Sequence, residues 1–336
     1  MAYEQRKGWF VLKKEIMFLS EQDVANLLTC EDVVEASEQV YREVGSNNVV
    51  FAKECFLSTG VKEGNRFLAN PVSFPEQGVL GFKWISMYMQ PEEGYPFSHG
   101  NLIVLNDIAT ALPVAIVGAT NITAMRTAGG HAVVAAKYLS VPEPRKLAVL
   151  GGGTQGTAGV KALLKQFPSL QKVSVLRPRQ PFIDAVQKAG NVSLQICDDP
   201  KTTIEDAELI LMAANAYEVL IEASWLKPGT TVLGINAFRD LDPALAKTAD
   251  KWVLGETEGD TRNILNNPEL TQGLDLSKHA FYGDMGEIVC GKKPGRENPD
   301  EIILYTHMGM GAFDVACAHM AYKRAKGQGM GTILSL

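Results

Sequence analysis

Six residues that follow a short apolar run carry the clearest chemical signal in the chain. The segment 151–156, GGGTQG, matches GxGxxG and directly follows the apolar run 147–150, which is typical of a strand. In such a turn the first glycine permits a tight bend, the middle one lets a pyrophosphate approach, and the last lets the helix pack on the strand. The free N–H groups at the start of the helix then bind phosphate oxygens. The predicted dinucleotide contacts are Gly151, Gly153, Thr154, Gln155 and Gly156.

The residues about 20 positions beyond the first glycines indicate which dinucleotide binds. NAD enzymes carry a carboxylate there, at the end of the second strand, which accepts hydrogen bonds from the ribose hydroxyls. This chain instead has Arg177, Pro178 and Arg179, with no acid. Two guanidinium groups suit a 2′-phosphate, because each can bind it through two charge-assisted hydrogen bonds. We predict a preference for NADP(H), with NAD(H) as the alternative if both arginines are merely solvated loop residues.

The composition restricts the partners that such a site could serve. The 336 residues include 38 acidic and 32 basic side chains, for a net charge of −6, and 46% are hydrophobic. Duplex nucleic acid requires a clustered basic surface, and the sequence has none. No run approaches the roughly 18 apolar residues of a membrane span, and the first 20 residues lack the pattern of a secretory signal. We therefore expect a cytoplasmic protein that acts on small molecules, with neither a nucleic-acid nor a membrane partner.

The cysteines argue against a metal site. The chain has no CxxC pair and no histidine at ligand spacing from a cysteine. An odd number of widely separated cysteines fits reduced thiols in a cytosolic enzyme, packed as small apolar side chains. We predict no bound metal. The five residues are Cys30, Cys55, Cys197, Cys290 and Cys317.

The elements that position the glycine turn divide into two groups. Up to about residue 127, helices from residue 20 and over 31–44 precede β-like runs that predict a meandering sheet. After residue 144, short apolar strands alternate with helices, which predicts a doubly wound parallel sheet. A final helix over 312–325 is expected to return to the first group. The predicted β-runs are 53–58, 66–71, 79–89, 101–106 and 113–118, and the later strands are 147–150, 173–176, 194–197, 209–213, 231–235, 252–254 and 302–305.

Several short motifs occur together and in order along nearly the whole chain. They are 81–84 (GFKW), 124–128 (AMRTA), the glycine turn, 234–237 (GINA), 308–310 (MGM) and 329–332 (GMGT). In this combination the chain resembles the ornithine cyclodeaminase and mu-crystallin family. The segment 294–304 looks closest to the siderophore-type branch, which is similar to N-(2-amino-2-carboxyethyl)-L-glutamate synthase.

The resemblance implies an architecture and an assembly. In this family the substrate amino acid lies between an N-terminal dimerisation domain and the dinucleotide domain. Residues 1–127 and 313–336 would form an α+β substrate-binding and dimerisation domain, completed by the C-terminal helix. Residues 128–312 would form the α/β Rossmann-type domain. The N-terminal sheet of the family pairs across a two-fold axis, so the resemblance implies a homodimer.

The resemblance also implies a set of basic residues that hold the substrate carboxylate. By motif match these are Lys83 and Arg126, and Lys53 stands where many members have an arginine. The chemistry agrees, because a carboxylate needs fixed cations and arginine offers a planar two-point fork. Lys83 lies in an otherwise apolar run, where an unpaired cation would be costly. A purely structural salt bridge remains the alternative for each residue.

The family further implies a proton shuttle and contacts to the nicotinamide. Asp240 is in register with the acid of the siderophore-type branch, and Asp242 is the fallback, with capping of the turn before Pro243 as its structural alternative. Asn236, Met308 and Gly309 would contact the cofactor. His307 abuts Met308 and is interpreted as a structural residue.

Together these residues imply reversible hydride transfer between nicotinamide C4 and the α-carbon of a small amino or imino acid. Asp240 and Lys83 are the predicted catalytic residues, and a pre-aligned donor and acceptor avoid much of the entropy cost of meeting. Ornithine cyclodeamination is the first alternative, although Leu68 stands where the cyclising members have their glutamate. A non-catalytic NADP-dependent ligand-binding protein is the second.

Overall fold

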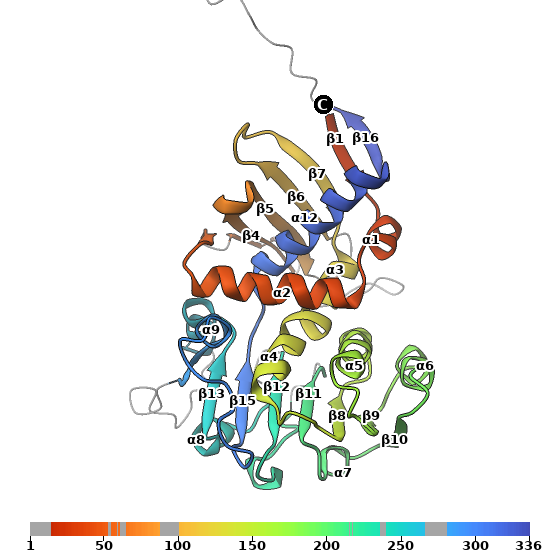
Figure 1. The fold of residues 1–336 in the computed structure, drawn as a ribbon, viewed down its shortest axis with the longest axis vertical. Helices are drawn as coiled ribbons and strands as arrows, with labels where there is room; N and C mark the ends of the chain where they lie inside the picture. Colours follow the sequence, from red (N-terminus) through yellow and green to blue (C-terminus); the bar gives the residue numbers. More distant parts are fainter. Residues whose placement is uncertain are drawn as a thin grey trace, which may run out of the picture.

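The protein contains two β-sheets with helices packed between and around them. The computed structural model describes residues 15–52, 55–58, 60, 65–87, 101–214, 216, 218–235, 240–265 and 281–336. One sheet lies above the other in Figure 1, and helix α2 (Cys30–Gly45) runs between them. Helix α2 packs against elements from both halves of the chain, including α11 (Met285–Val289) and α12 (Gly311–Gln328).

The first sheet is mostly antiparallel and includes strands from both ends of the described chain. Its order is β16-β1-β7-β6-β5-β4-β2, with β3 also paired to β4. Strands β4 to β7 form the predicted meander, β7 pairs in parallel with β1, and β1 pairs antiparallel with β16. The strands are β1 (Glu15–Leu19), β2 (Val50–Phe51), β3 (Cys55–Ser58), β4 (Arg66–Phe74), β5 (Val79–Met87), β6 (Leu102–Asp107), β7 (Pro113–Gly118) and β16 (Thr332–Ser335).

Helix α12 covers this sheet. It contacts β4, β5 and β6 on one side and α2 and α3 on the other. Small buried side chains on α12, among them Ala312, Ala318 and Ala321, allow this close packing. Helices α1 (Glu21–Leu27) and α2 both begin with a capping box, in which Ser20 pairs with Asp23 and Thr29 with Asp32.

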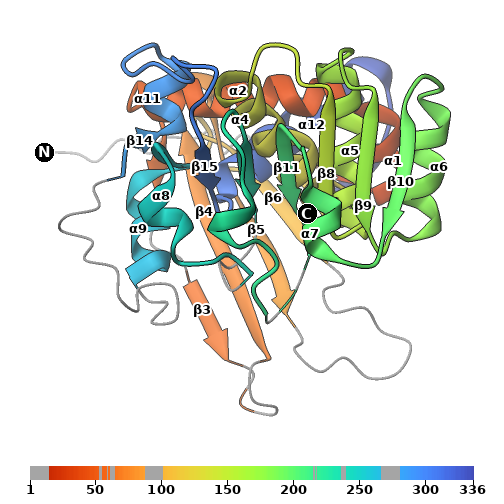
Figure 2. The ribbon, with the colours of Figure 1, turned by 90° about the horizontal axis from the view of Figure 1, so that it is seen from below.

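The second sheet is entirely parallel, as the alternating pattern predicts. Its order is β10-β9-β8-β11-β12-β15-β13-β14, and Figure 2 shows β11, β8, β9 and β10 side by side. The order reverses between β8 and β11, which creates the switch point where ligands bind in such sheets. The strands are β8 (Lys146–Leu150), β9 (Lys172–Leu176), β10 (Ser193–Cys197), β11 (Leu209–Met212), β12 (Thr231–Gly234), β13 (Lys251–Leu254), β14 (Gly283–Asp284) and β15 (Ile303–Thr306).

The remaining helices are mostly short. They are α3 (Thr120–Arg126), the π-helix η2 (Thr127–His131), α4 (Ala132–Leu139), α5 (Thr154–Gln166), α6 (Gln180–Lys188), α7 (Pro200–Ile204), α8 (Leu245–Thr248) and α9 (Thr257–Leu265), with 3-10 turns η1 (Pro75–Gln77) and η3 (Ala223–Trp225). None of the helices in the described ranges has the length and apolar content that a membrane crossing requires.

Several parts of the fold were not predicted from the sequence, and two of them have a clear physical reason. The helical stretch α3–η2–α4 contains two adjacent glycines, which disfavour a helix interior. They are accommodated because a Cβ on Gly130 would lie 2.6 Å from Ser37 Oγ, and one on Gly129 would lie 3.2 Å from the Ala158 carbonyl oxygen. Close helix packing therefore overrides local propensity there. The β1–β16 pairing joins segments more than 300 residues apart, a distance at which local patterns carry no information. The domain boundaries remain a prediction.

Candidate active site

The glycine turn lies at the switch point of the parallel sheet, between the end of β8 and the start of α5. Gly151 has φ +106°, and a Cβ there would lie 2.5 Å from the Ala214 nitrogen. A Cβ on Gly156 would lie 2.1 Å from the Gly151 carbonyl oxygen. A Cβ on Gly153 would meet none of the described atoms within 4 Å. The turn is therefore tightly packed beneath and open at the N-terminus of α5, which fits a bound pyrophosphate.

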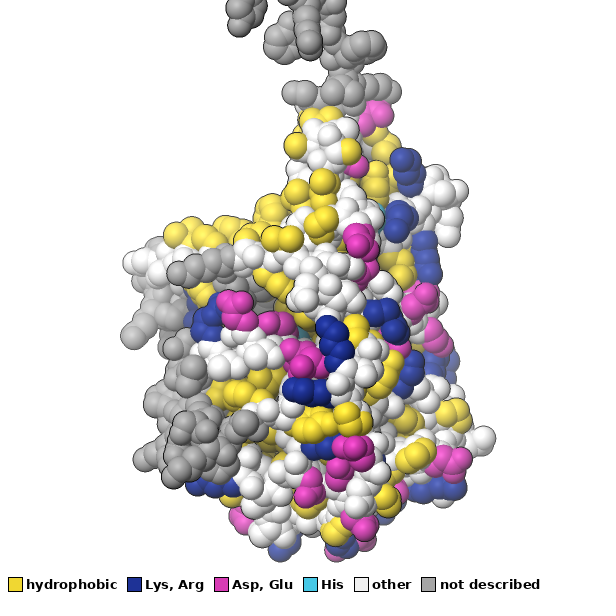
Figure 3. Space-filling model, turned by 60° about the vertical axis from the view of Figure 1, so that its left-hand side comes forward, with side chains coloured by type: hydrophobic (Ala, Val, Ile, Leu, Met, Phe, Trp, Pro, Cys, Tyr) yellow, Lys and Arg dark blue, Asp and Glu magenta, His cyan; other side chains and the backbone are white. Residues whose placement is uncertain are grey.

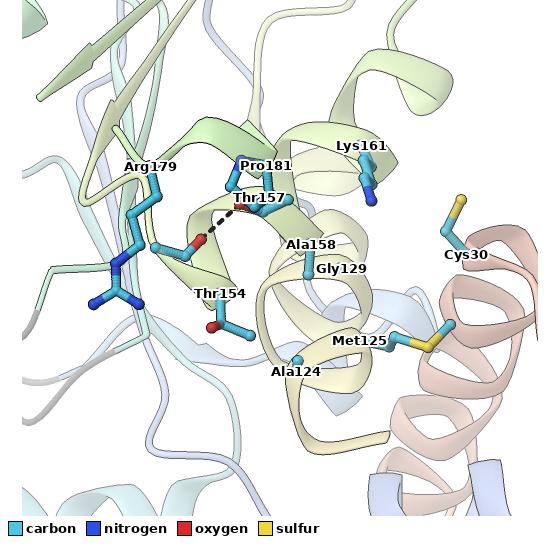
Figure 4. Close-up of a pocket in the computed structure, with 11 residues that line it drawn as sticks. Cys30, Ala124, Met125, Gly129, Thr154, Thr157, Ala158, Lys161, Arg179 and Pro181 are labelled. Carbon is cyan, nitrogen blue, oxygen red and sulfur yellow. Dashed lines mark hydrogen bonds between the residues drawn. The ribbon is translucent and has the colours of Figure 1, made fainter. Parts of the chain in front are cut away.

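Beside this turn is a cavity of about 460 Å³. Figure 4 shows Thr154 and Arg179 on one side of it, with Lys161 and Cys30 farther along. The Arg179 N–H donates to the Gly152 carbonyl at 3.0 Å, so this residue is anchored to the glycine turn through its backbone while its side chain is exposed. The cavity therefore combines a helix N-terminus with cationic side chains.

Two further predicted cofactor residues have defined positions near this end. Arg177 follows β9 with φ +46°, is exposed, and donates from Nη2 to the Asp198 carbonyl at 3.3 Å. Gln155 turns away from the open end, because its Oε1 accepts a hydrogen bond from the Ala128 N–H at 3.3 Å. Gln155 thus links α5 to the π-helix η2.

Lys83 and Arg126 meet at a buried carboxylate. Lys83 lies on β5, Arg126 ends α3, and Asp314 lies in the first turn of α12. Lys83 Nζ donates to Asp314 Oδ1 at 2.9 Å, and Arg126 Nε donates to the same oxygen at 3.2 Å. The three residues are 1%, 7% and 0% exposed, respectively. With both cations charged, the cluster carries one more positive charge than negative, buried between the sheets.

The cluster is incomplete in its hydrogen bonding. Arg126 Nη1 and Asp314 Oδ2 are buried, and no described residue bonds to either atom. Gly309, at φ +84°, approaches so closely that a Cβ there would lie 2.2 Å from Arg126 Nη1. Burial and the neighbouring guanidinium lower the pKa of Lys83 to about 8, against the opposing effect of Asp314. A buried excess cation with a free donor is the arrangement that an anionic ligand would complete.

The predicted acids lie after β12. Asp240 is 2% exposed, and its carbonyl accepts a hydrogen bond from the Leu220 N–H at 2.9 Å. Asp242 accepts from the Ala244 N–H at 2.8 Å and from the Ala223 N–H at 3.1 Å. One Asp242 oxygen therefore binds the backbone of the turn before α8, and the other binds the start of η3. The N-cap residue of α8 is Ala244, so Asp242 does not cap that helix as the structural alternative expected. The predicted residues Lys53 and Asn236 lie outside the described residues.

At the end of β15, His307 pairs with a carboxylate that the sequence did not reveal. Its Nδ1 lies 2.7 Å from Asp260 Oδ2, and both side chains are buried. Asp260 also accepts backbone hydrogen bonds from Gly255, Glu256 and Met308. Three backbone donors thus hold the Asp260 carboxylate, which in turn holds the ring at Nδ1. The ring Nε2 has no partner among the described residues. The Met308 side chain, by contrast, is exposed.

A second histidine lies behind this pair. His131 Nδ1 is 2.8 Å from Tyr305 Oη, which is 2.7 Å from Tyr41 Oη. The His131 and His307 rings meet edge to face, with centroids 4.8 Å apart. Burial lowers the pKa of His131 well below its ordinary value, so the ring is neutral at pH 7. This layer supports the candidate site from the α2 side.

A cavity of about 480 Å³ lies where the first sheet meets the ends of the second-sheet strands. Its walls come from β2, β4, the start of α9 and the segment that joins β15 to α12. The lining residues include Phe51, Asn70, Asp260, His307, Gly309 and Gly311. Through Gly309 and His307 the cavity adjoins both the ion cluster and the histidine–aspartate pair.

Asp314 and Asp260 are the residues that sequence reasoning missed. Asp314 is the only acid between residues 302 and 336, within a helix otherwise rich in small and apolar residues in its first half. A buried acid in such a setting needs a cationic partner. That signal was present, but choosing Lys83 and Arg126 as the partners requires the tertiary structure.

A doubly wound parallel sheet with a glycine turn at its switch point defines a dinucleotide-binding protein. Residues 14–329 match the model of the ornithine cyclodeaminase/mu-crystallin family, and the chain belongs to that family. The resemblance inferred from the short motifs is thereby confirmed.

The relatives include dehydrogenases and reductases. The N-((2S)-2-amino-2-carboxyethyl)-L-glutamate dehydrogenase of Staphylococcus aureus is 27% identical over 337 residues, covering 97% of this chain and 100% of the relative. An archaeal alanine dehydrogenase with bound NAD matches with a TM-score of 0.85 and 23% identity, over 96% of this chain and 99% of that one. The Thermococcus litoralis Δ¹-pyrroline-2-carboxylate reductase, in complex with NADH and L-proline, matches with a TM-score of 0.83 and 25% identity. The match covers 94% of this chain and 99% of that one.

All three relatives are dehydrogenases or reductases of amino acids or of a cyclic imine, and the two solved structures contain NAD or NADH. The predicted α/β fold class and the predicted class of enzyme, an oxidoreductase of amino or imino acids, are therefore confirmed. Three predictions remain predictions. They are the roles of individual residues, the preference for NADP(H) and the homodimer.

Proposed function

We propose that the protein transfers hydride reversibly between a nicotinamide and the α-carbon of a small α-amino acid or its imine, with NADP(H) preferred. The observation that carries this proposal is the buried cluster of Lys83, Arg126 and Asp314. Its excess positive charge and the free Arg126 Nη1 suit a substrate carboxylate. Gly309, which lies against Arg126, also lines the 480 Å³ cavity beside His307.

In this mechanism the protein binds, orients and moves protons. Arg126 and Lys83 hold the carboxylate, and Lys53 adds a third cation. Because hydrogen bonds to Asp314 restrain both cations before the substrate arrives, little reorganisation is needed on binding. Asp240 exchanges a proton with the substrate nitrogen, and Lys83, with its pKa of about 8, is the second group able to do so near neutral pH. The bound nicotinamide supplies or accepts the hydride.

The cofactor end of the proposal rests on the glycine turn and on the arginines after β9. The pyrophosphate would lie over Gly153 and Thr154, at the open N-terminus of α5. Arg179 and Arg177 would bind the 2′-phosphate, because both are exposed cations at the carboxyl end of β9. Asn236, Met308 and Gly309 would line the nicotinamide end.

We further propose a cytoplasmic homodimer. Support for the dimer comes from apolar side chains on the outer strands of the first sheet, where Val50, Phe51, Phe56 and Leu57 are all exposed. Figure 3 shows hydrophobic side chains gathered on the upper half of one face, where the first sheet lies. Covering such a surface by a second copy would remove it from water. Five free cysteines agree with a reducing compartment.

The test follows loss of reduced-nicotinamide absorbance with NADPH and with NADH. Purified protein is offered a panel of α-keto acids with ammonia or an amino acid as the amine, together with preformed cyclic imines. The proposal expects consumption that requires the keto acid or imine and is faster with NADPH. Asp240→Asn is expected to abolish turnover while cofactor affinity stays unchanged.

Two other outcomes would contradict the proposal. Formation of proline and ammonia from ornithine, with no net change in added nicotinamide, would instead make the protein a cyclodeaminase. Tight NADPH binding without turnover of any keto acid and amine, or of any imine, would make it a ligand-binding protein. In that case Asp240→Asn would leave the NADPH affinity unchanged and abolish no activity.

A further inference from the structure

Asn70 presents a buried acceptor that the fold leaves unused. Its Oδ1 is shielded from solvent, and no described residue donates a hydrogen bond to it. An unpaired buried amide oxygen costs stability, so natural proteins seldom keep one without a use. Asn70 lies on β4 directly opposite Lys83 on β5. Directly opposed residues project to the same face of a sheet, so Asn70 and the proposed carboxylate-binding lysine face the same side.

Asn70 and Arg126 flank the same short stretch of backbone. A Cβ on Gly311 would lie 2.5 Å from the Asn70 carbonyl oxygen and 2.9 Å from its Cβ. Two residues earlier, Gly309 approaches Arg126 Nη1 just as closely. Asn70, Gly309 and Gly311 all line the 480 Å³ cavity. The residue with the free donor, Arg126, thus lies against one end of the segment 309–311, and the residue with the free acceptor, Asn70, lies against the other end.

We propose that Asn70 Oδ1 accepts a hydrogen bond from the α-nitrogen of the substrate. An amino acid presents a carboxylate and an N–H donor two bonds apart, and this site offers an unpaired cationic donor and an unpaired acceptor in the same region. The residue would therefore select acids that carry an α-amino or imino N–H over acids that lack it. This inference rests on the proposed function and deepens it.

The experiment compares matched ligands by calorimetry with NADP⁺ bound. The ligand pairs are L-alanine with propionate, L-glutamate with glutarate, and L-proline with cyclopentanecarboxylate. Wild-type protein is expected to bind at least one amino acid about 10- to 100-fold more tightly than its partner, the range of one hydrogen bond to a charged group. Asn70→Leu is expected to remove this preference and to leave the affinity for the nitrogen-free acid unchanged.

A second measurement separates binding from structure. Because leucine replaces an unpaired polar group with an apolar one of similar size, Asn70→Leu is expected to keep or raise the melting temperature without ligand. Asn26→Leu makes the same change on the exposed face of α1. It is expected to alter neither the melting temperature nor the preference for amino acids.

Several results would overturn the inference. These are a large fall in the melting temperature of Asn70→Leu, an equal loss of affinity for both members of a pair, an unchanged preference, or a wild type that prefers no amino acid. An equal loss would show that the amide binds the carboxylate. Preference without hydride transfer would instead refute the proposed reaction and leave the role of Asn70 standing, so the two failures are distinguishable.

Discussion

The two ends of the candidate site hold their positive charges in opposite ways. Lys83 and Arg126 are buried and share the carboxylate of Asp314, whereas Arg177 and Arg179 are exposed on a loop. A buried cation is fixed before a ligand arrives, and it depends on its counterion for stability. An exposed arginine keeps its freedom and contributes little until a phosphate binds it. If the proposed roles hold, a substitution in the buried cluster should change both ligand binding and stability, whereas one in the exposed arginines should change binding alone.

Removing the shared carboxylate tests whether the two buried cations depend on it for stability. Asp314→Asn leaves two buried cations without their counterion, so we expect a loss of about 3–5 kcal/mol in the free energy of unfolding, measured by urea denaturation. Asp198→Asn, on the exposed loop beside Arg177, is the matched control and should change it by less than about 0.5 kcal/mol. Equal effects of the two substitutions would refute the coupling.

Removing one cation separates binding from folding. Lys83→Met leaves Arg126 and Asp314 as a neutral pair, so the free energy of unfolding should fall less than in Asp314→Asn. The proposed role predicts that kcat/KM falls at least about 100-fold, since both a carboxylate contact and a group able to move protons are lost. Lys326→Met, exposed in the last turn of α12, is the control and should retain full activity.

Substitutions of the exposed arginines should change cofactor binding and leave the stability of the fold almost unchanged. Arg179→Ala is expected to raise KM for NADPH about 10- to 100-fold and to leave KM for NADH unchanged. Thermal unfolding without cofactor should be nearly unaltered, because the side chain is exposed. Arg177→Ala should act in the same direction. A parallel loss with both cofactors would assign Arg179 to the shape of the glycine turn, which its backbone contacts, and not to the 2′-phosphate.

The smallest expected effect is on pH dependence. The pKa of Lys83 is about 8 in the folded protein, below its ordinary value of 10.5. The unfolded chain thus binds more protons between these two values, and the contribution of Lys83 to stability rises with pH across that window. Binding of the substrate carboxylate should weaken above about pH 8, as Lys83 loses its charge. Calorimetry at pH 7 to 10 should show this decline in the wild type and not in Lys83→Met.

The sequence made the cofactor end predictable and left much of the substrate end hidden. The glycine turn and the parallel strands are local patterns, set by residues within about 30 positions of one another. The ion cluster joins residues 231 positions apart, and the His307–Asp260 pair spans 47. Motif resemblance could indicate Lys83 and Arg126, but only the packing of α12 on β5 identifies Asp314 as their common partner.

The late position of Asp314 has a consequence for how the chain matures. Lys83 and Arg126 are synthesised long before the segment that neutralises them, and strand β16 follows later still to pair with β1. While the chain is being made, the first sheet lacks strand β16, and Lys83 on β5 and Arg126 on α3 lack their shared counterion. Burying both cations before that segment is present would place two like charges together without their counterion, which is unfavourable. The buried ion cluster can therefore form only after the chain has been synthesised past Asp314.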